Sequence, residues 1–181
     1  MPHVADPDRH PHAPADVESP PSDTAAAAHG PHAAELERLE AHYQAMPPVA
    51  AMQLRITGLD GHRLQLHAPL SVHVNDKGCA FGGSLASMMT LASWGVVSML
   101  VERAGLHADV FVADSQVRYL APLFADLDVS AEPAADADVR EFIDTLRSRG
   151  RARLGMVARA ALPEGGVATE FSARYVAIAR S

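Results

Sequence analysis

The sequence predicts an α+β fold in which one curved antiparallel sheet wraps around a single long central helix. The helix, expected from about Gly83 to Ala104, carries apolar residues around most of its circumference. A helix that is apolar on nearly all sides is enclosed by other structure. Strand patterns occur both before and after this segment, so the enclosing structure is predicted to be a sheet.

The first 32 residues differ from the rest of the chain. They are rich in Pro, Ala, His and Asp and hold almost no large apolar side chains. Such a segment cannot bury enough surface to offset its ordering entropy. We therefore predict a disordered tail over 1–32 and a single domain over 33–181. The histidines of the tail fit no zinc-ligand spacing, and we interpret them as biased composition. They are His3, His10, His12, His29 and His32.

The segments that precede the central helix are predicted to be one helix and two strands. Residues 33–46 carry apolar residues at helical spacing, and Pro47 and Pro48 end the pattern. Residues 51–70 then read as a strand pair with a turn over 58–61, of sequence GLDG. The apolar residues expected to alternate with polar ones in the pair are Met52, Leu54, Ile56, Leu64 and Leu66.

The segments that follow the helix are mainly strands, predicted to be four with hairpin links. Residues 108–122 alternate, and so do residues 125–133, in which Leu127 and Val129 should face inward. Residues 136–150 are interpreted as a short helix or a long irregular connection. Two final strands, 151–162 and 168–180, are joined by the turn sequence PEGG. In the 108–122 strand one face should hold Phe111, Ala113, Ser115, Val117 and Tyr119, and the other Val112, Asp114, Gln116 and Arg118. A sheet of such strands curved about one helix is the hotdog fold.

Composition excludes several classes of function. A formal net charge of −7 argues against broad nucleic-acid binding. The single cysteine, Cys79, cannot form an internal disulfide, and no signal peptide is visible, so a cytoplasmic location is expected. The apolar run 85–101 is interrupted by Ser and Thr, and we interpret it as a buried helix rather than a membrane span. No cofactor and no metal site are predicted.

The segment NDKGCAFGGSLASMMTLASWG, residues 75–95, is the candidate site. Gly82 and Gly83 come at the start of the predicted helix, where the first backbone N–H groups lack internal partners and carry partial positive charge. Glycine lets a ligand oxygen approach those groups closely. A thioester carbonyl held there would be stabilised as it becomes an oxyanion. The alternative is a plain tight turn that leads into a helix.

The same segment resembles a known family. Asn75, Gly78 and the run Phe81-Gly82-Gly83 resemble hotdog-fold thioesterases of the phenylacetate-pathway type. The fuller segment, with ADSQVRYLAPL downstream, is more similar to the thioesterases of the YiiD C-terminal type. Members of that family occur alone or behind a GNAT acetyltransferase domain, and the resemblance, over roughly 40–180, implies the stand-alone form. It also implies paired subunits, as a homodimer or higher homo-oligomer, with the site between them.

Two departures from the phenylacetate type affect the expected chemistry. Phe81 stands where that type has His, and Thr90 stands where it carries its catalytic Asp. Hydrolysis needs a group that accepts a proton from water. The nearby candidates are Asp76, in a loop, and Asp114, on the apparent outward face of a strand. Decarboxylation of a malonyl thioester needs no such group, only stabilisation of the enolate oxygen. The resemblance links some family members to malonyl-acyl carrier protein decarboxylation in fatty acid metabolism.

These arguments give a set of candidate residues. The catalytic candidates are Asn75, Gly83 and Thr90, and the substrate-binding candidates are Phe81, Gly82, Ser84, Ser87 and Trp94. Ser84, Ser87, Thr90, Trp94 and Ser98 form an uncharged strip along the helix. Several alternatives stay open. Asn75 is also a common turn residue, and Thr90 could bond back to its own helix. Cys79 is interpreted as a buried filler. His73 could be a base or a loop residue, and we favour the loop residue because no partner fixes its tautomer.

The sequence as a whole therefore predicts an enzyme that acts on acyl thioesters of coenzyme A or acyl carrier protein. Thioester hydrolysis is the first hypothesis, malonyl-thioester decarboxylation the second, and a non-catalytic acyl-thioester binding module the third. A basic cluster at 147–153 could meet the phosphates of coenzyme A or an acidic carrier protein, or simply face solvent. Neither nucleic acid nor membrane is an expected partner.

Overall fold

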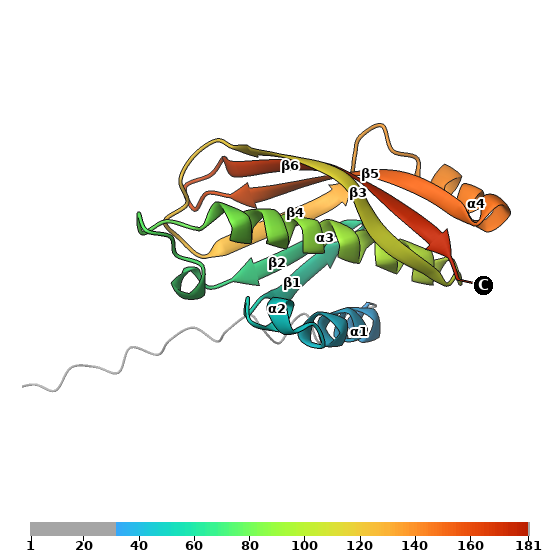
Figure 1. The fold of residues 1–181 in the computed structure, drawn as a ribbon, viewed down its shortest axis with the longest axis horizontal. Coiled ribbons are helices and arrows are strands. Elements are labelled where there is room, and N and C mark those ends of the chain that lie inside the picture. Colours follow the sequence, from blue (N-terminus) through green and yellow to red (C-terminus); the bar gives the residue numbers. More distant parts are fainter. Residues whose placement is uncertain (1–31, 181) are drawn as a thin grey trace, which may run out of the picture.

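A single six-stranded antiparallel sheet wraps around one long helix, which confirms the predicted hotdog fold. The structure is a computed structural model that describes residues 32–180; the tail prediction falls almost wholly outside them. The strand order is β1-β2-β4-β5-β6-β3, and α3 lies in the concave side of the sheet (Figure 1). The first helices and strands are α1 (Ala33–Gln44), α2 (Pro47–Ala50), β1 (Arg55–Asp60), β2 (Arg63–Ala68) and the 3-10 helix η3 (Leu70–Val72). The others are α3 (Gly82–Arg103), β3 (Ala108–Tyr119), β4 (Leu127–Pro133), α4 (Val139–Arg149), β5 (Arg151–Ala161) and β6 (Val167–Ala179).

The order of the last four strands departs from a series of hairpins. Only β5 and β6 form the expected hairpin, through the turn that contains Gly165 and Gly166. β3 lies at the far edge of the sheet, where it pairs with β6, and β4 pairs with β2 and β5. The connection between β4 and β5 contains α4, so the helical alternative for residues 136–150 is correct. Asp138 caps α4 by accepting from Glu141 N at 2.9 Å.

Helix α3 is the core of the fold. By length and composition it could cross a membrane, but 61% of its most apolar 18-residue stretch is buried within the protein, as expected for the central helix of a globular domain. Two buried tyrosines bond to its middle turns. Tyr43 donates to Leu91 O at 2.8 Å, and Tyr175 donates to Thr90 O at 2.7 Å. Burial raises the pKa of both hydroxyls.

Gly95 lies where Tyr43 crosses α3. A Cβ atom at Gly95 would lie 2.8 Å from Cδ2 of Leu64 and closer still to the Tyr43 hydroxyl oxygen. Real Cβ atoms essentially never approach so closely, so the packing of α1 and β2 on α3 requires glycine here.

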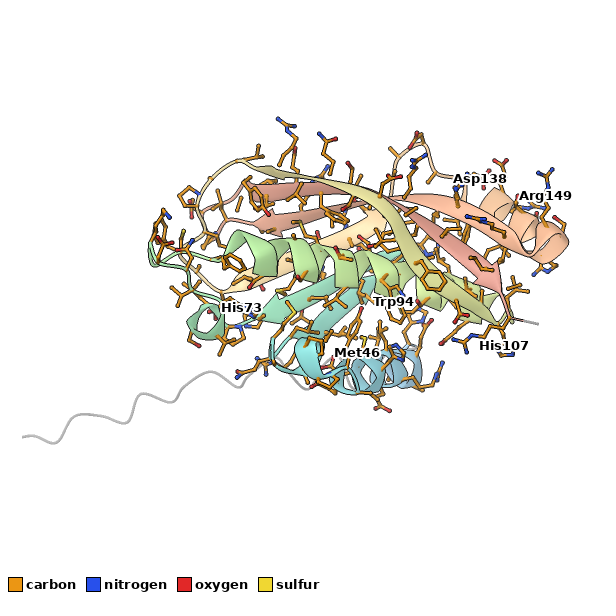
Figure 2. The ribbon with its side chains drawn as sticks, viewed as in Figure 1. Met46, His73, Trp94, His107, Asp138 and Arg149 are labelled. Atoms are coloured by element: carbon orange, nitrogen blue, oxygen red, sulfur yellow. The ribbon has the colours of Figure 1, made fainter. Side chains whose placement is uncertain are left out.

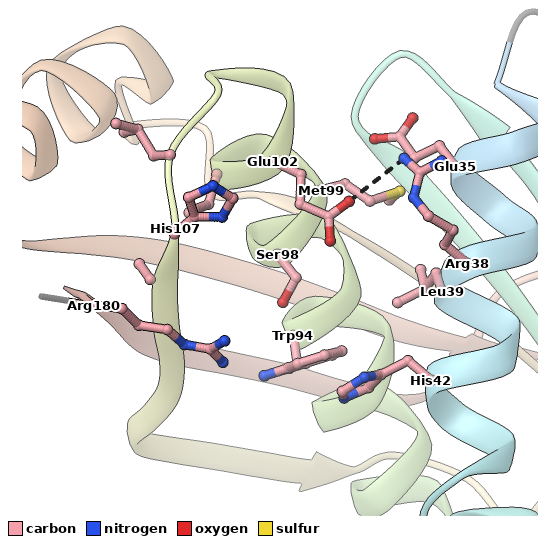
Figure 3. Close-up of a pocket in the computed structure, with 13 residues that line it drawn as sticks. Glu35, Arg38, Leu39, His42, Trp94, Ser98, Met99, Glu102, His107 and Arg180 are labelled. Atoms are coloured by element: carbon pink, nitrogen blue, oxygen red, sulfur yellow. Dashed lines mark ion pairs between the residues drawn. The ribbon is translucent and has the colours of Figure 1, made fainter.

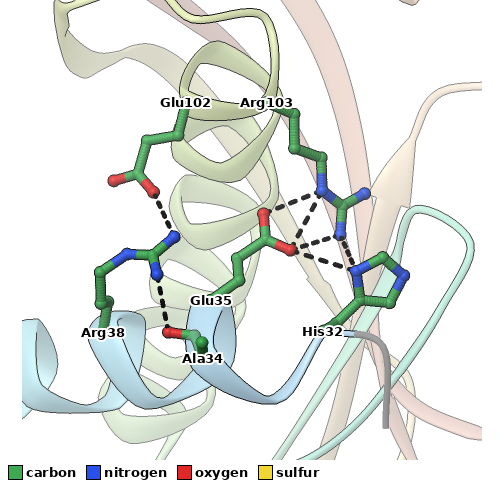
Figure 4. Close-up of polar contacts among 6 residues, drawn as sticks. All are labelled: His32, Ala34, Glu35, Arg38, Glu102 and Arg103. Carbon is green, nitrogen blue, oxygen red and sulfur yellow. Dashed lines mark hydrogen bonds and ion pairs between the residues drawn. The ribbon is translucent and has the colours of Figure 1, made fainter.

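Helix α1 is held against the far end of α3 by ion pairs (Figure 4). Arg103 contacts both carboxylate oxygens of Glu35, at 2.7–3.1 Å, and Arg38 lies 3.7 Å from Glu102. His42 of α1 stacks on Trp94 with 4.9 Å between ring centroids. The Arg38–Glu102 pair is exposed and contributes little. The buried side chains of Leu39 and Tyr43 add apolar contacts to the attachment.

The turn between the first two strands is shorter than the sequence suggested. The expected turn over 58–61 is wrong, because Gly58 and Leu59 pair with β2 and only Gly61 and His62 connect the strands. Gly61 has φ +57°, a conformation that such two-residue hairpins need. Met52 and Leu54 precede β1, although Leu54 is fully buried as its apolar character requires.

Strand β3 changes face partway along. Its pairing with β6 shifts between Val112 and Asp114, so Ala113 is an extra residue in a β-bulge. Beyond the bulge, Val117 packs on the core as predicted. Before it, Val110 packs inward instead of Phe111, which is exposed. The predicted face of residues 108–122 is therefore correct for its second half and wrong for its first.

Candidate active site

The glycine pair lies at the start of α3, as predicted. Phe81 precedes the helix, and its carbonyl accepts from Ser84 N at 3.0 Å and from Leu85 N at 3.2 Å. The amides of Gly82 and Gly83 donate no hydrogen bond to any group within residues 32–180. As the first donors of a long helix, they carry the partial positive charge that favours an anionic oxygen.

An aromatic ring packs closely on each of the two glycines. The Tyr119 hydroxyl donates to Gly82 O at 2.9 Å, and a Cβ at Gly82 would lie 3.1 Å from the Tyr119 ring. A Cβ at Gly83 would lie 2.8 Å from Cζ of Phe81 and closer to Cε1. Both rings are 56% exposed. No site role was predicted for Tyr119, because its link to Gly82 depends on β3 lying beside the start of α3.

His73 is the functional candidate that sequence reasoning undervalued. It follows η3, and its side chain is only 5% exposed. Its Nε2 lies 2.8 Å from Met52 O, and its Nδ1 lies 2.9 Å from Ser84 Oγ. A carbonyl oxygen only accepts, so Nε2 carries the hydrogen, and in the neutral ring Nδ1 accepts from the Ser84 hydroxyl. His73 lies in a loop, as expected, but the expectation that no partner fixes its tautomer is wrong.

The loop that carries His73 is fastened to the start of α3. His73 O accepts from Phe81 N at 2.7 Å, and Val74 forms a β-bridge with Ala80. These contacts bring the histidine to the same end of the molecule as the glycine pair, far from Trp94 (Figure 2). The structure therefore brings the Ser84 hydroxyl and the His73 imidazole together next to the two helix amides that donate to no group within residues 32–180.

Asn75 has the turn contacts that were kept as its alternative role. Its Oδ1 accepts from Lys77 N at 2.8 Å and from Cys79 N at 3.3 Å, and its Nδ2 lies 3.3 Å from Cys79 Sγ. Cys79 is buried, consistent with a filler. Asn75 thus shapes the turn before the glycine pair, and its catalytic role stays a prediction.

Thr90 bonds back to its own helix, because its hydroxyl donates to Ala86 O at 2.8 Å. It belongs to the uncharged strip, which is the less buried side of α3: Ser87 is exposed, and Ser84, Thr90, Trp94 and Ser98 are half-buried. Trp94 donates to Val110 O at 3.1 Å. The strip is thus a continuous, uncharged side of the helix that begins at the glycine pair.

A cavity of about 290 Å³ lies at the other end of the strip, between α1, the second half of α3 and the start of β3 (Figure 3). Trp94 and Ser98 line it, together with the Arg38–Glu102 pair. At 1.5 Å per residue, Ser98 lies about 22 Å along the helix from Gly83. Of the eight candidates from sequence, only Trp94 reaches this cavity.

The carboxylates considered as bases are engaged elsewhere. Asp76 is exposed and pairs with Lys77 at 3.0 Å. Asp114 bonds to Arg174, and that hydrogen bond lowers the pKa of the Asp114 carboxyl. The basic cluster at 147–153 is exposed and starts at the end of α4, and Figure 2 shows Arg149 at the opposite end of the molecule from His73.

Comparisons with known proteins agree with this architecture. Residues 35–179 match the model of the family described as "Putative thioesterase (yiiD_Cterm)". A protein of unknown function from Chlorobaculum tepidum has a similar structure, with 25% identity, a TM-score of 0.76, and coverage of 81% of this chain and 95% of the other. A "putative thioesterase" from Shewanella oneidensis is similar at 25% identity, with a TM-score of 0.71 and coverage of 79% and 96%. A thioesterase family protein from Silicibacter pomeroyi, at 18% identity, has a TM-score of 0.60 and coverage of 80% and 98%, which is a likeness of fold.

Proposed function

Because the chain belongs to the YiiD C-terminal family of thioesterases, we propose that it hydrolyses acyl thioesters of coenzyme A or acyl carrier protein at the start of α3. The observation that carries this proposal is the buried His73 ring, whose Nδ1 is held as a proton acceptor 2.9 Å from Ser84 Oγ. Hydrolysis requires a proton acceptor, and the run after Lys77, residues 78–95, has neither a carboxylate nor a histidine.

The unpaired amides of Gly82 and Gly83 supply the second element of the reaction. The thioester carbonyl oxygen would accept from them and gain negative charge as the carbonyl is attacked. Removal of one such donor costs about 3–4 kcal/mol of transition-state stabilisation in enzymes of this general type. The exposed rings of Phe81 and Tyr119 would border the thioester, and the strip of Ser84, Ser87, Thr90 and Trp94 would line the acyl chain.

A homodimer is part of the proposal. β3 is an edge strand, so one side of its backbone has no strand partner within residues 32–180. Phe111 and Val112 on this strand are exposed. A second copy that covers this edge would satisfy its backbone groups and remove an apolar surface from water. An elution volume of a monomer in size-exclusion chromatography would contradict this arrangement.

Malonyl-thioester decarboxylation is the second candidate, and the uncharged strip favours it. A carboxylate there would repel the carboxylate of a malonyl group, whereas Ser and Thr hydroxyls do not. The enolate oxygen formed as carbon dioxide leaves would be held by the same two amides. Asn75 would assist only if its amide left the turn contacts with Lys77 and Cys79.

One experiment separates the functions. The protein is incubated with malonyl-, acetyl- and decanoyl-acyl carrier protein and with the matching coenzyme A esters. Free thiol from the acetyl or decanoyl esters supports hydrolysis. Acetyl thioester formed from the malonyl ester without free thiol supports decarboxylation instead. Binding with neither product leaves the acyl-thioester binding module.

A variant at Asn75 tests its catalytic role in the same assay. If Asn75 acts in catalysis, Asn75→Ala lowers turnover far more than substrate binding. Lys77→Ala, in the same turn but exposed and paired with Asp76, is the matched control. Unchanged turnover in Asn75→Ala would leave Asn75 as a residue of the turn alone.

A further inference from the structure

We propose that Ser84 is a covalent nucleophile, which takes the acyl group from the thioester as a serine ester while His73 accepts and returns the proton. The inference rests on the proposed hydrolase function and adds an intermediate to it. It rests on the contact between the Ser84 hydroxyl and the His73 imidazole, whose other nitrogen already bonds to Met52 O.

The imidazole is fixed on both sides. Nε2 donates to Met52 O at 2.8 Å, and Nδ1 accepts from Ser84 Oγ at 2.9 Å. The ring is buried, and its backbone is held by Leu70 O at 2.8 Å and by Phe81 N at 2.7 Å. A nucleophile within hydrogen-bond reach of a base that a third group orients is the arrangement that activates hydroxyl nucleophiles. Here a backbone carbonyl is the orienting group.

The position of the serine suits attack on a thioester. Ser84 is only half-buried, and it follows directly after Gly82 and Gly83, whose amides are unpaired within the described part of the chain. An acyl group on Ser84 would therefore lie at the beginning of the uncharged strip. The substrate class is a thioester whose acyl chain can follow that strip.

The reaction has two balanced halves. In the first, Ser84 Oγ forms a bond to the carbonyl carbon as its proton moves to His73 Nδ1; the carbon–sulfur bond then breaks and the proton leaves with the thiol. In the second, water attacks the ester carbon as His73 Nδ1 takes one of its protons. The ester bond breaks, the proton returns to Ser84 Oγ, and the carboxylic acid leaves.

A purely structural reading of the pair is that it fastens the η3 loop to α3. A structural role and a catalytic role both predict that Ser84→Ala lowers turnover. The decisive measurement is therefore made on the wild-type protein. Full-length protein is treated with diisopropyl fluorophosphate, which phosphorylates activated serines, and the labelled peptide is identified by mass spectrometry. A nucleophilic Ser84 carries the label, and His73→Gln slows its labelling by about 100-fold or more. A hydroxyl that only fastens the loop stays unlabelled.

The substrate arm uses decanoyl-coenzyme A with rapid acid quenching. The expected result is a mass increase of one decanoyl group on the peptide with Ser84, absent in Ser84→Ala and kept in Ser172→Ala, an exposed serine on β6. Thermal melting verifies that each variant is folded. Folded Ser84→Ala with turnover within about twofold of wild type, or no label on Ser84 in an active enzyme, would overturn the inference. Labelled Ser84 without any thioester turnover would instead contradict the proposed function.

Discussion

Gly83 and Gly95 lie on the same helix, and each has an aromatic side chain close to it, but one of these side chains is exposed and the other is buried. A Cβ at either would come within 3.0 Å of an aromatic side chain. At Gly83 that side chain is Phe81, which is 56% exposed, whereas at Gly95 it is the fully buried Tyr43. The exposed Phe81 ring can move away from a new methyl group, whereas the enclosed Tyr43 ring has no space to do so. The middle of α3 is therefore enclosed by buried side chains, whereas its first turn is bordered by exposed ones.

The largest effect on stability should come from Gly95→Ala. The new methyl group would overlap Tyr43 and Leu64, both fully buried. Overpacking costs about 1–3 kcal/mol. Because two fully buried side chains stand in the way, the cost should lie at the upper end of that range and exceed the gain of about 1 kcal/mol from replacing a helical glycine. Urea unfolding would measure the loss. Stability equal to that of wild type would mean that Tyr43 has room to move.

Tyr43→Phe should have a smaller effect and should couple to the first change. It removes the donor to Leu91 O and lowers the free energy of unfolding by about 1 kcal/mol. It also removes the oxygen nearest to the Cβ of Gly95→Ala. In a double-mutant cycle, the cost of Gly95→Ala should therefore fall in the Tyr43→Phe background. Additive costs would show that Leu64 alone makes the clash.

Alkaline pH should lower the free energy of unfolding through the buried hydroxyl of Tyr43. Burial raises the pKa of Tyr43 above its ordinary value, so the folded state favours the neutral hydroxyl. The stabilisation is complete below the unfolded pKa of about 10 and is lost as the pH rises toward the raised folded pKa. Unfolding measured from pH 8 to 11 should show this loss, and Tyr43→Phe should reduce it. An equal slope in both proteins would assign the loss to other groups.

The smallest effect on stability is expected from Gly83→Ala, the matched partner of Gly95→Ala. The exposed Phe81 ring can rotate away, and alanine is a better helix former, so the free energy of unfolding should change by less than about 1 kcal/mol. Thioester turnover should fall about tenfold, because the methyl group and the displaced ring would crowd the helix amides. A stability loss as large as that of Gly95→Ala would remove the distinction between the two regions.

Features that depend on residues close together along the chain could be predicted from the sequence. The all-round apolar character of 83–104 predicted a buried helix, and the glycine pair was correctly placed at its start. The partners of those residues were not predictable in the same way. His73 meets Ser84 only because η3 and the Val74–Ala80 bridge fold the loop back, and Tyr119 reaches Gly82 only because β3 lies at that edge of the sheet.

The extra residue Ala113 affects β3 through the length of the strand and not through the chemistry of its side chain. Because successive side chains of a strand point to opposite faces, one extra residue resets which half of β3 faces the helix. Deletion of Ala113 would restore a regular alternation and turn either the Ala108 end or the Tyr119 end outward. In the latter case Tyr119 would release Gly82. Replacement of Ala113 by another small residue should therefore be tolerated, whereas its deletion should not. The position acts as a spacer that keeps Tyr119 in contact with Gly82, whatever small side chain it carries.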